Sequence, residues 1–125
     1  MSPGTEINIR DTAGIKIVGN AANPITIKGA SNTPGAWLGI KIDGTNLMNE
    51  IAFATIANAG EDPSTNRGAI DLWYNAKLNI HDTEFKDLAS CGVYGRLLSG
   101  QNSNPNYSSA NLSFINTPCT ELFEN

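Results

Sequence analysis

The chain has 125 residues, enough for one domain with a hydrophobic core. It contains 16 Asn, 12 Gly and 13 Ile, whereas Asp, Glu, Lys and Arg together make up only 16%. A mostly helical domain would be richer in Leu, Ala, Glu and Lys, so this composition argues against helices. Isoleucine favours strands, and Asn and Gly tolerate the left-handed backbone of tight turns. The composition therefore predicts short strands joined by many turns.

The formal net charge is −4, and the eight basic residues occur singly along the chain. No cluster of them could neutralise a run of phosphates or an anionic lipid surface, so we expect no nucleic-acid partner. No apolar stretch approaches the ~18 residues of a membrane span, so we expect no membrane insertion. Residues 1–5 are polar, and we find no signal peptide in this chain.

Short runs with apolar residues at alternate positions recur along the chain, separated by Gly, Asn, Pro and Asp. In chain order, the predicted strands are residues 6–10, 15–18, 25–28, 37–43, 50–56, 69–73, 77–85, 93–97 and 111–115. Each run has the length of a strand, and none shows a sustained helical period. The pattern predicts an all-β protein.

Predicted strands that lie three apart in order resemble one another. The three series are residues 39–43, 69–73 and 92–96; those starting at Ile51, Leu78 and Leu112; and those ending at Ile27, Ile56 and Phe85. A mean period of about 29 residues predicts a coil with three strands per turn. A Greek-key sandwich also has short strands, but it gives no reason for every third strand to be alike.

Several motifs follow one another in an order that is typical of one group of repeats. They are NPITIKG at 23–29, PGAWLGI at 34–40, NEIAFATI at 49–56, AG at 59–60, LNIHDTEF at 78–85 and CGVYG at 91–95. This order, from about residue 5 to residue 116, resembles the right-handed parallel β-helix repeats of bacterial surface and secreted proteins. It is most similar to a group often found in exported lipoproteins, within the pectate-lyase-like superfold.

This resemblance implies a right-handed parallel β-helix, a single-stranded solenoid of about four to five coils with three short strands each. We expect one β-helix domain over residues 1–125, forming a segment of a longer exported protein that is extracellular or at the cell surface. A solenoid exposes unpaired backbone at its ends, and residues 1–10 and 121–125 are too short to cap it. We therefore expect self-association through coil ends or strand edges, giving a homo-oligomer.

The aligned strands also align outward-facing side chains. One row should hold Lys41, Asp71 and Tyr94, and the next Asp43, Trp73 and Arg96, with Tyr74 beside them. Aromatic rings stack on sugars while carboxylates and guanidinium groups bind hydroxyls, so an exposed face of this kind suits a glycan. Alternatively, the two neighbouring aromatic residues pack under the loop at 58–67 and the charges only pair across coils.

Catalysis is less well supported by the residues present. A carbohydrate-active enzyme fragment, a polysaccharide lyase or hydrolase, could use Asp43, Asp71 and Arg96, or coils outside this chain. Glu61 and Asp62 fall in a loop, and the lone His81 sits at a corner, where local hydrogen bonding is the ordinary role. No nucleophile, metal or phosphate motif occurs. We predict no catalytic residue, no metal and no cofactor.

The two cysteines, Cys91 and Cys119, are 28 residues apart, which is one coil. They should then lie about 4.8 Å apart in the stacking direction, within the range of a disulfide. Either a disulfide or two stacked buried thiols would fit. The residues as a whole favour a non-catalytic module that presents a flat face to a glycan or a protein, with the enzyme fragment and a purely structural or assembly module as alternatives.

Overall fold

The computed structural model describes residues 1–44, 47–60 and 67–125. These residues form ten strands and no helix, so the all-β prediction is confirmed for them. The strands are β1 (Glu6–Arg10), β2 (Lys16–Val18), β3 (Ile25–Ile27), β4 (Gly39–Asp43), β5 (Asn49–Ala57), β6 (Gly68–Trp73), β7 (Leu78–Lys86), β8 (Cys91–Arg96), β9 (Tyr107–Ile115) and β10 (Cys119–Glu124). Over the described ranges, no helix is long and apolar enough to cross a bilayer.

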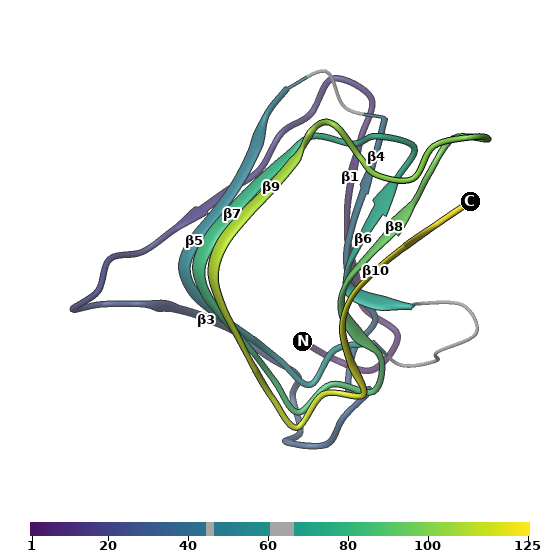
Figure 1. Cartoon of the computed structure of the whole chain (residues 1–125). Coiled ribbons are helices and arrows are strands. Elements are labelled where there is room, and N and C mark those ends of the chain that lie inside the picture. Colours follow the sequence, from purple (N-terminus) through teal and green to yellow (C-terminus); the bar gives the residue numbers. More distant parts are fainter. Residues whose placement is uncertain (45–46, 61–66) are drawn as a thin grey trace.

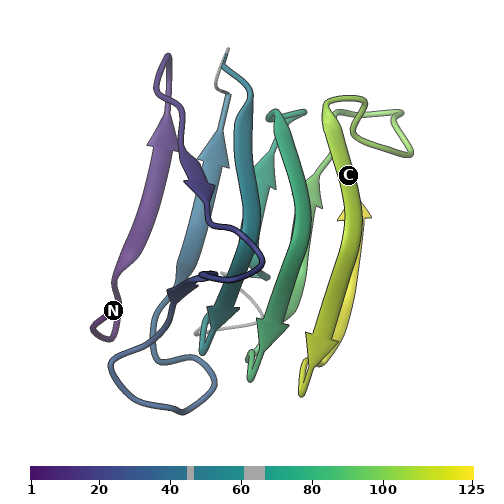
Figure 2. The same ribbon diagram turned by 90° about the vertical axis from the view of Figure 1, so that its left-hand side faces the viewer.

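The strands build a parallel β-solenoid of about four turns. Sheet A has the order β1-β4-β6-β8-β10, and sheet B has the order β2-β5-β7-β9 with β3 also paired to β5. Figure 1, viewed along the solenoid, shows sheet A opposite sheet B, and Figure 2 shows the coils side by side in chain order. The predicted coil is confirmed, but the prediction of three strands per coil is wrong, because there are two sheets.

The difference arises from a bend within the long strands of sheet B. Phe53, Asp82 and Asn111 have φ values of 50°, 49° and 51°, the left-handed region, near the middle of β5, β7 and β9. The second and third series, which the predicted coil counted as two strands, therefore fall on the two arms of one bent strand. Within this sheet the second series was also misaligned, because Ile51 pairs with Ile80 and not with Leu78.

Sheet A follows the predicted register. Ile40 pairs with Ile70, which pairs with Val93, so the first series was correctly aligned. All three side chains are buried inside the solenoid with their counterparts from sheet B. Each fully buried side chain of this size contributes roughly 1.5–3 kcal/mol relative to an exposed one. The stacked inward rows are thus the hydrophobic core of every coil.

Asparagine links successive coils, as its abundance predicts. Asn111 Nδ2 donates to Asp82 Oδ1 of the preceding coil over 3.2 Å, and Asn116 Nδ2 donates to Asp87 Oδ1 over 2.9 Å. The buried Asn49 accepts from the Ile15 backbone N–H through its Oδ1 and donates to a backbone carbonyl of the next coil through its Nδ2. These amides satisfy corner backbone and side-chain groups that would otherwise lack partners.

β10, the last strand of sheet A, was not predicted from the sequence. Its Phe123 pairs in register with Gly95 of β8 and packs against the core. A Cβ atom at Gly95 would collide with the Phe123 ring, so the missing side chain on β8 makes the space that the ring occupies. Phe123 thus packs β10 against the solenoid and helps to position Glu124 and Asn125, which follow it in the chain.

Candidate functional site

The two predicted rows of side chains are in register on sheet A. Asp71 is the register partner of Lys41 on one side and of Tyr94 on the other. Trp73 likewise lies between Asp43 and Arg96 in the next row. The prediction that the first row is exposed is wrong for two of its members: Asp71 is 4% exposed and Tyr94 is 3% exposed. Both face away from the core but are covered by side chains from neighbouring coils. The surface is therefore not a flat row of free groups.

The side chains of Lys41 and Arg96 both pack on the ring of Trp73. The Nζ of Lys41, from β4, lies 3.7 Å from the Trp73 ring centroid, and the Cζ of Arg96, from β8, lies 4.4 Å from it. Cations over an indole are stabilised by its ring quadrupole. Because these two cations already lie over the indole, Trp73 is poorly placed to stack on a sugar. Tyr74, which packs edge-on against Trp73 and is 51% exposed, is the free aromatic side chain here.

Asp71 is a buried carboxyl group without an ion pair among the described residues. Burial raises its pKa from the ordinary 3.8 to about 6, while the charge of Arg96 and the indole N–H of Trp73 oppose the shift. Asp71 Oδ1, Trp73 Nε1 and Arg96 Nε are each buried and lack a partner at hydrogen-bonding geometry. A buried carboxylate without a compensating partner lowers the stability of the fold. Buried groups with a shifted pKa are frequent near functional sites.

A pocket of about 420 Å³ opens beside this cluster on the outer face of sheet A. We call it the Tyr74–Glu124 pocket, and its lining consists of Arg67, Tyr74, Tyr94, Arg96, Leu97, Glu124 and Asn125. Three of the predicted binding residues, Tyr74, Tyr94 and Arg96, meet there. The other four, Lys41, Asp43, Asp71 and Trp73, lie outside the lining.

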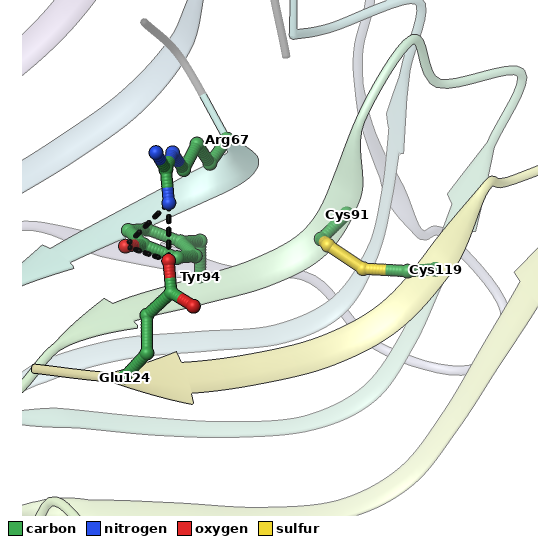
Figure 3. The surroundings of a disulfide bond; sticks show 5 residues. All are labelled: Arg67, Cys91, Tyr94, Cys119 and Glu124. Atoms are coloured by element: carbon green, nitrogen blue, oxygen red, sulfur yellow. Dashed lines mark hydrogen bonds and ion pairs between the residues drawn. A yellow bond between two sulfur atoms is a disulfide. The ribbon is translucent and has the colours of Figure 1, made fainter. Parts of the chain in front are cut away.

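One wall of the pocket comes from β10, through Glu124. The Tyr94 hydroxyl donates to Glu124 Oε1 over 2.8 Å, and Arg67 forms an ion pair with the same carboxylate (Figure 3). Burial and the hydrogen bond to Glu124 both raise the pKa of Tyr94, so it remains a neutral phenol at physiological pH. Arg67, Leu97, Glu124 and Asn125 were not predicted. The 28-residue cysteine spacing could have found Glu124, because it also aligns Glu124 with Arg96.

The two cysteines form a disulfide at the start of β10. Cys91 and Cys119 are register partners of β8 and β10 with Cα atoms 4.5 Å apart, which settles the choice that their spacing left open. A second, more apolar hollow of about 280 Å³ adjoins the bond. Ala89, Ser90, Cys91, Pro118 and Leu122 line it together with Arg67 and Glu124. The Arg67–Glu124 pair therefore borders both hollows.

The two arginines of the pocket differ in whether a carboxylate neutralises them. Glu124 neutralises Arg67, whereas Arg96 has no ion pair among the described residues. The pocket thus offers one guanidinium group, an exposed phenol and the amide of Asn125. This combination can hold a polar ligand that has a ring face and an acidic or hydroxyl substituent.

His81, another titratable residue singled out in the sequence, lies on β7 of sheet B. Glu61 and Asp62 fall outside the described residues. His81 Nδ1 donates to the Asp82 carboxylate Oδ2 over 2.7 Å, and this contact raises the pKa of His81 and lowers that of Asp82. Its Nε2 lies 3.6 Å from Glu50 Oε2. His81 is thus bonded locally, as its position predicts. No metal-binding group of three or more His, Cys, Asp or Glu side chains occurs within the described ranges.

Polar hollows also occur on sheet B, of about 230 Å³ and 370 Å³, and both border Thr55 and Glu84. Neither has an exposed aromatic ring beside an uncompensated guanidinium group. The Tyr74–Glu124 pocket is therefore the better candidate for ligand binding.

The strand pairing and the pocket together define a parallel β-solenoid with a polar, aromatic-lined site on one sheet. A scan against protein-family models, a search of curated proteins and a search of solved structures found no match to this chain. The assignment as a parallel β-solenoid therefore rests on the strand pairing of this chain alone.

Proposed function

We propose that this protein is a non-catalytic β-helix module of a bacterial surface or secreted protein, and that it binds a glycan in the Tyr74–Glu124 pocket. The observation that carries the proposal is the exposed ring of Tyr74 beside Arg96, a cation without an ion pair among the described residues. A pyranose ring would stack on the Tyr74 face, and an acidic substituent would meet the guanidinium group. Sugar hydroxyls would bond with Asn125 and with free oxygen positions of Glu124.

The family and compartment are parts of the same proposal. The ordered motifs of the first coils support membership of the exported bacterial β-helix repeats, with right-handed coiling. Nearly all connections between parallel strands of one sheet take that hand. The Cys91–Cys119 disulfide supports an oxidising location, because such bonds persist outside the cytosol.

The enzyme alternative has less support from the site. Asp71, the register partner of Tyr94, is buried and is not part of the pocket lining, so a bound sugar would not reach its carboxylate. Among the described residues of the lining, the one carboxylate is that of Glu124, and it is paired with Arg67. Two carboxyl groups flanking one bond, as glycoside hydrolysis requires, are not offered by these lining residues.

Self-association is a second proposal, supported by the two end coils. Ile7 and Ile9 at one end, and Leu112, Phe114 and Phe123 at the other, pack against the core but are only partly buried. Stacking one molecule on the next would bury these side chains and pair the free edges of both sheets. Sedimentation velocity at several concentrations tests this, and a monomer at every concentration would refute it.

A glycan array tests the leading proposal. The protein should bind a subset of glycans, and Tyr74→Ala should lose that binding at least tenfold because the stacking ring is removed. The matched control is Val18→Ala, which truncates an apolar side chain of comparable exposure on sheet B. Binding that survives Tyr74→Ala but is lost in the control would place the site elsewhere, and no binding to any glycan would refute the proposal.

A further inference from the structure

Strand β10 forms one wall of the pocket and is an edge strand of sheet A. It pairs only with β8 among the described strands; three of its six residues are exposed and none is buried. The strand and the residue after it contribute Glu124 and Asn125 to the lining. Whatever holds β10 against β8 therefore also determines whether this wall exists.

Side-chain links occur at both ends of β10 (Figure 3). At its start, Cys119 is covalently bonded to its register partner Cys91. At its end, Glu124 accepts from Tyr94 and pairs with Arg67, and Asn125 Nδ2 donates to the Gln101 carbonyl over 2.7 Å. Between them, Phe123 packs into the space above Gly95.

These links differ in strength. The side chains of Arg67 and Glu124 are each 41% exposed, so their pairing is weakened by water and by salt. Asn125 is exposed, and Phe123 is only partly buried. Strand pairing to a single neighbour is open to fraying. The disulfide is the one link whose strength does not depend on excluding water.

We propose that the Cys91–Cys119 disulfide positions β10 as a wall of the Tyr74–Glu124 pocket, so that the pocket is assembled only in the oxidised protein. In the reduced protein β10 detaches from β8 beyond residue 119, and Glu124 leaves Arg67 and Tyr94. The pocket then loses its carboxylate and the Asn125 amide, and Arg67 becomes a second uncompensated cation. This regulation rests on the proposed function for the ligand, but the assembly of the wall does not.

The chemical step is thiol–disulfide exchange with a dithiol reductant. One reductant thiolate attacks a cysteine sulfur, the Cys91–Cys119 bond breaks, and a mixed disulfide forms. The second reductant thiolate displaces that sulfur and closes the reductant's own disulfide. Cys91 and Cys119 each gain a proton and become thiols, so two electrons pass from the reductant to the protein.

Backbone NMR of the oxidised and the dithiothreitol-reduced protein tests the wall without any ligand. On reduction, the amide signals of residues 120–125 should move to disordered positions, while those of β5 and β7 stay in place. The double variant Cys91→Ser/Cys119→Ser should show the reduced pattern and no response to dithiothreitol, because the chain has no other cysteine. Unmoved signals at 120–125, or collapse of the whole spectrum, would overturn the proposal.

The glycan array, repeated on both redox forms, tests the consequence for binding. Binding should fall at least tenfold on reduction, and Glu124→Gln should weaken it with the disulfide intact. Equal binding by the oxidised and reduced forms would overturn the inference. If the oxidised protein binds no glycan, the proposed function fails, and the NMR result alone then decides whether the disulfide holds the wall.

Discussion

Asp71 on β6 lies buried one strand away from Arg96 on β8, and no ion pair between them compensates its carboxylate. The arrangement lowers stability at neutral pH, because desolvation penalises the charged form more than Arg96 favours it. Its first consequence is a dependence of stability on pH.

The pKa of Asp71 is about 6 in the folded protein, against an ordinary 3.8. Between these pH values the folded form binds more protons than the unfolded form, so the contribution of Asp71 to the free energy of unfolding falls as pH rises through this window. The loss amounts to about 3 kcal/mol by pH 8. Asp71→Asn should remove it, making the variant more stable than the native protein at pH 8 and similar to it at pH 4.

Urea unfolding at pH 4 and pH 8 measures this difference. Asp43→Asn is the matched control, because it neutralises a half-buried carboxylate on the neighbouring strand. The control should leave the difference between the two pH values in place. An Asp71→Asn variant that is less stable than the native protein at pH 8 would show that the charged carboxylate stabilises the fold.

The stacked isoleucine row should be sensitive to truncation. Ile40 and Ile70 are register partners with 1% and 0% exposure, so Ile→Ala at either position should cost about 2–5 kcal/mol. Val18→Ala on sheet B, where the side chain is half exposed, should change the free energy of unfolding by about 0.5 kcal/mol or less. Denaturant titration compares them, and equal losses would contradict the assigned core.

The space above Gly95 should admit the Phe123 ring and nothing more. Gly95→Ala places a methyl group where the ring lies, and the overpacking should cost about 1–3 kcal/mol. In a Phe123→Ala background the same change should cost far less, because the ring that it meets is gone. A double-mutant cycle in urea measures the coupling. Additive effects would mean that the two residues do not share this space.

The disulfide should stabilise the protein chiefly by restricting the unfolded chain. The bond closes a loop with a sequence separation of 28, for which loop closure contributes about 3–4 kcal/mol. Urea titration with and without dithiothreitol measures this contribution, with Cys91→Ser/Cys119→Ser as the control that should not respond to the reductant. A native protein as stable reduced as oxidised would contradict it.

Much of the fold could be predicted from local patterns of apolar residues in the sequence. Alternation of apolar residues located nine of the ten described strands, and the likeness of residues 39–43, 69–73 and 92–96 predicted the register of Lys41, Asp71 and Tyr94. Both signals are strong because each inward row repeats the same burial in every coil. β10 escaped notice because an edge strand with exposed Thr120, Glu121 and Leu122 lacks that alternation.

The bend in the strands of sheet B could not be predicted from the alternation of apolar residues either. Phe53 and Asp82 lie within the predicted runs 50–56 and 77–85, but their left-handed backbone separates two arms, which the repeat series counted as two strands of a coil. Only hydrogen bonding between coils distinguishes the two cases. The count of three strands per coil failed for this reason.

The amino-acid sequence by itself determined the coil, its period and the abundance of Asn at its corners, because these repeat locally along the chain. Only the tertiary structure decided the pocket, because its walls are far apart in sequence: Arg67 and Glu124 are separated by 57 residues. It also decided the burial of Asp71, which neighbouring coils cover with Lys41 and Arg96. Contacts between coils, which no local pattern encodes, thus convert the predicted flat face into a pocket.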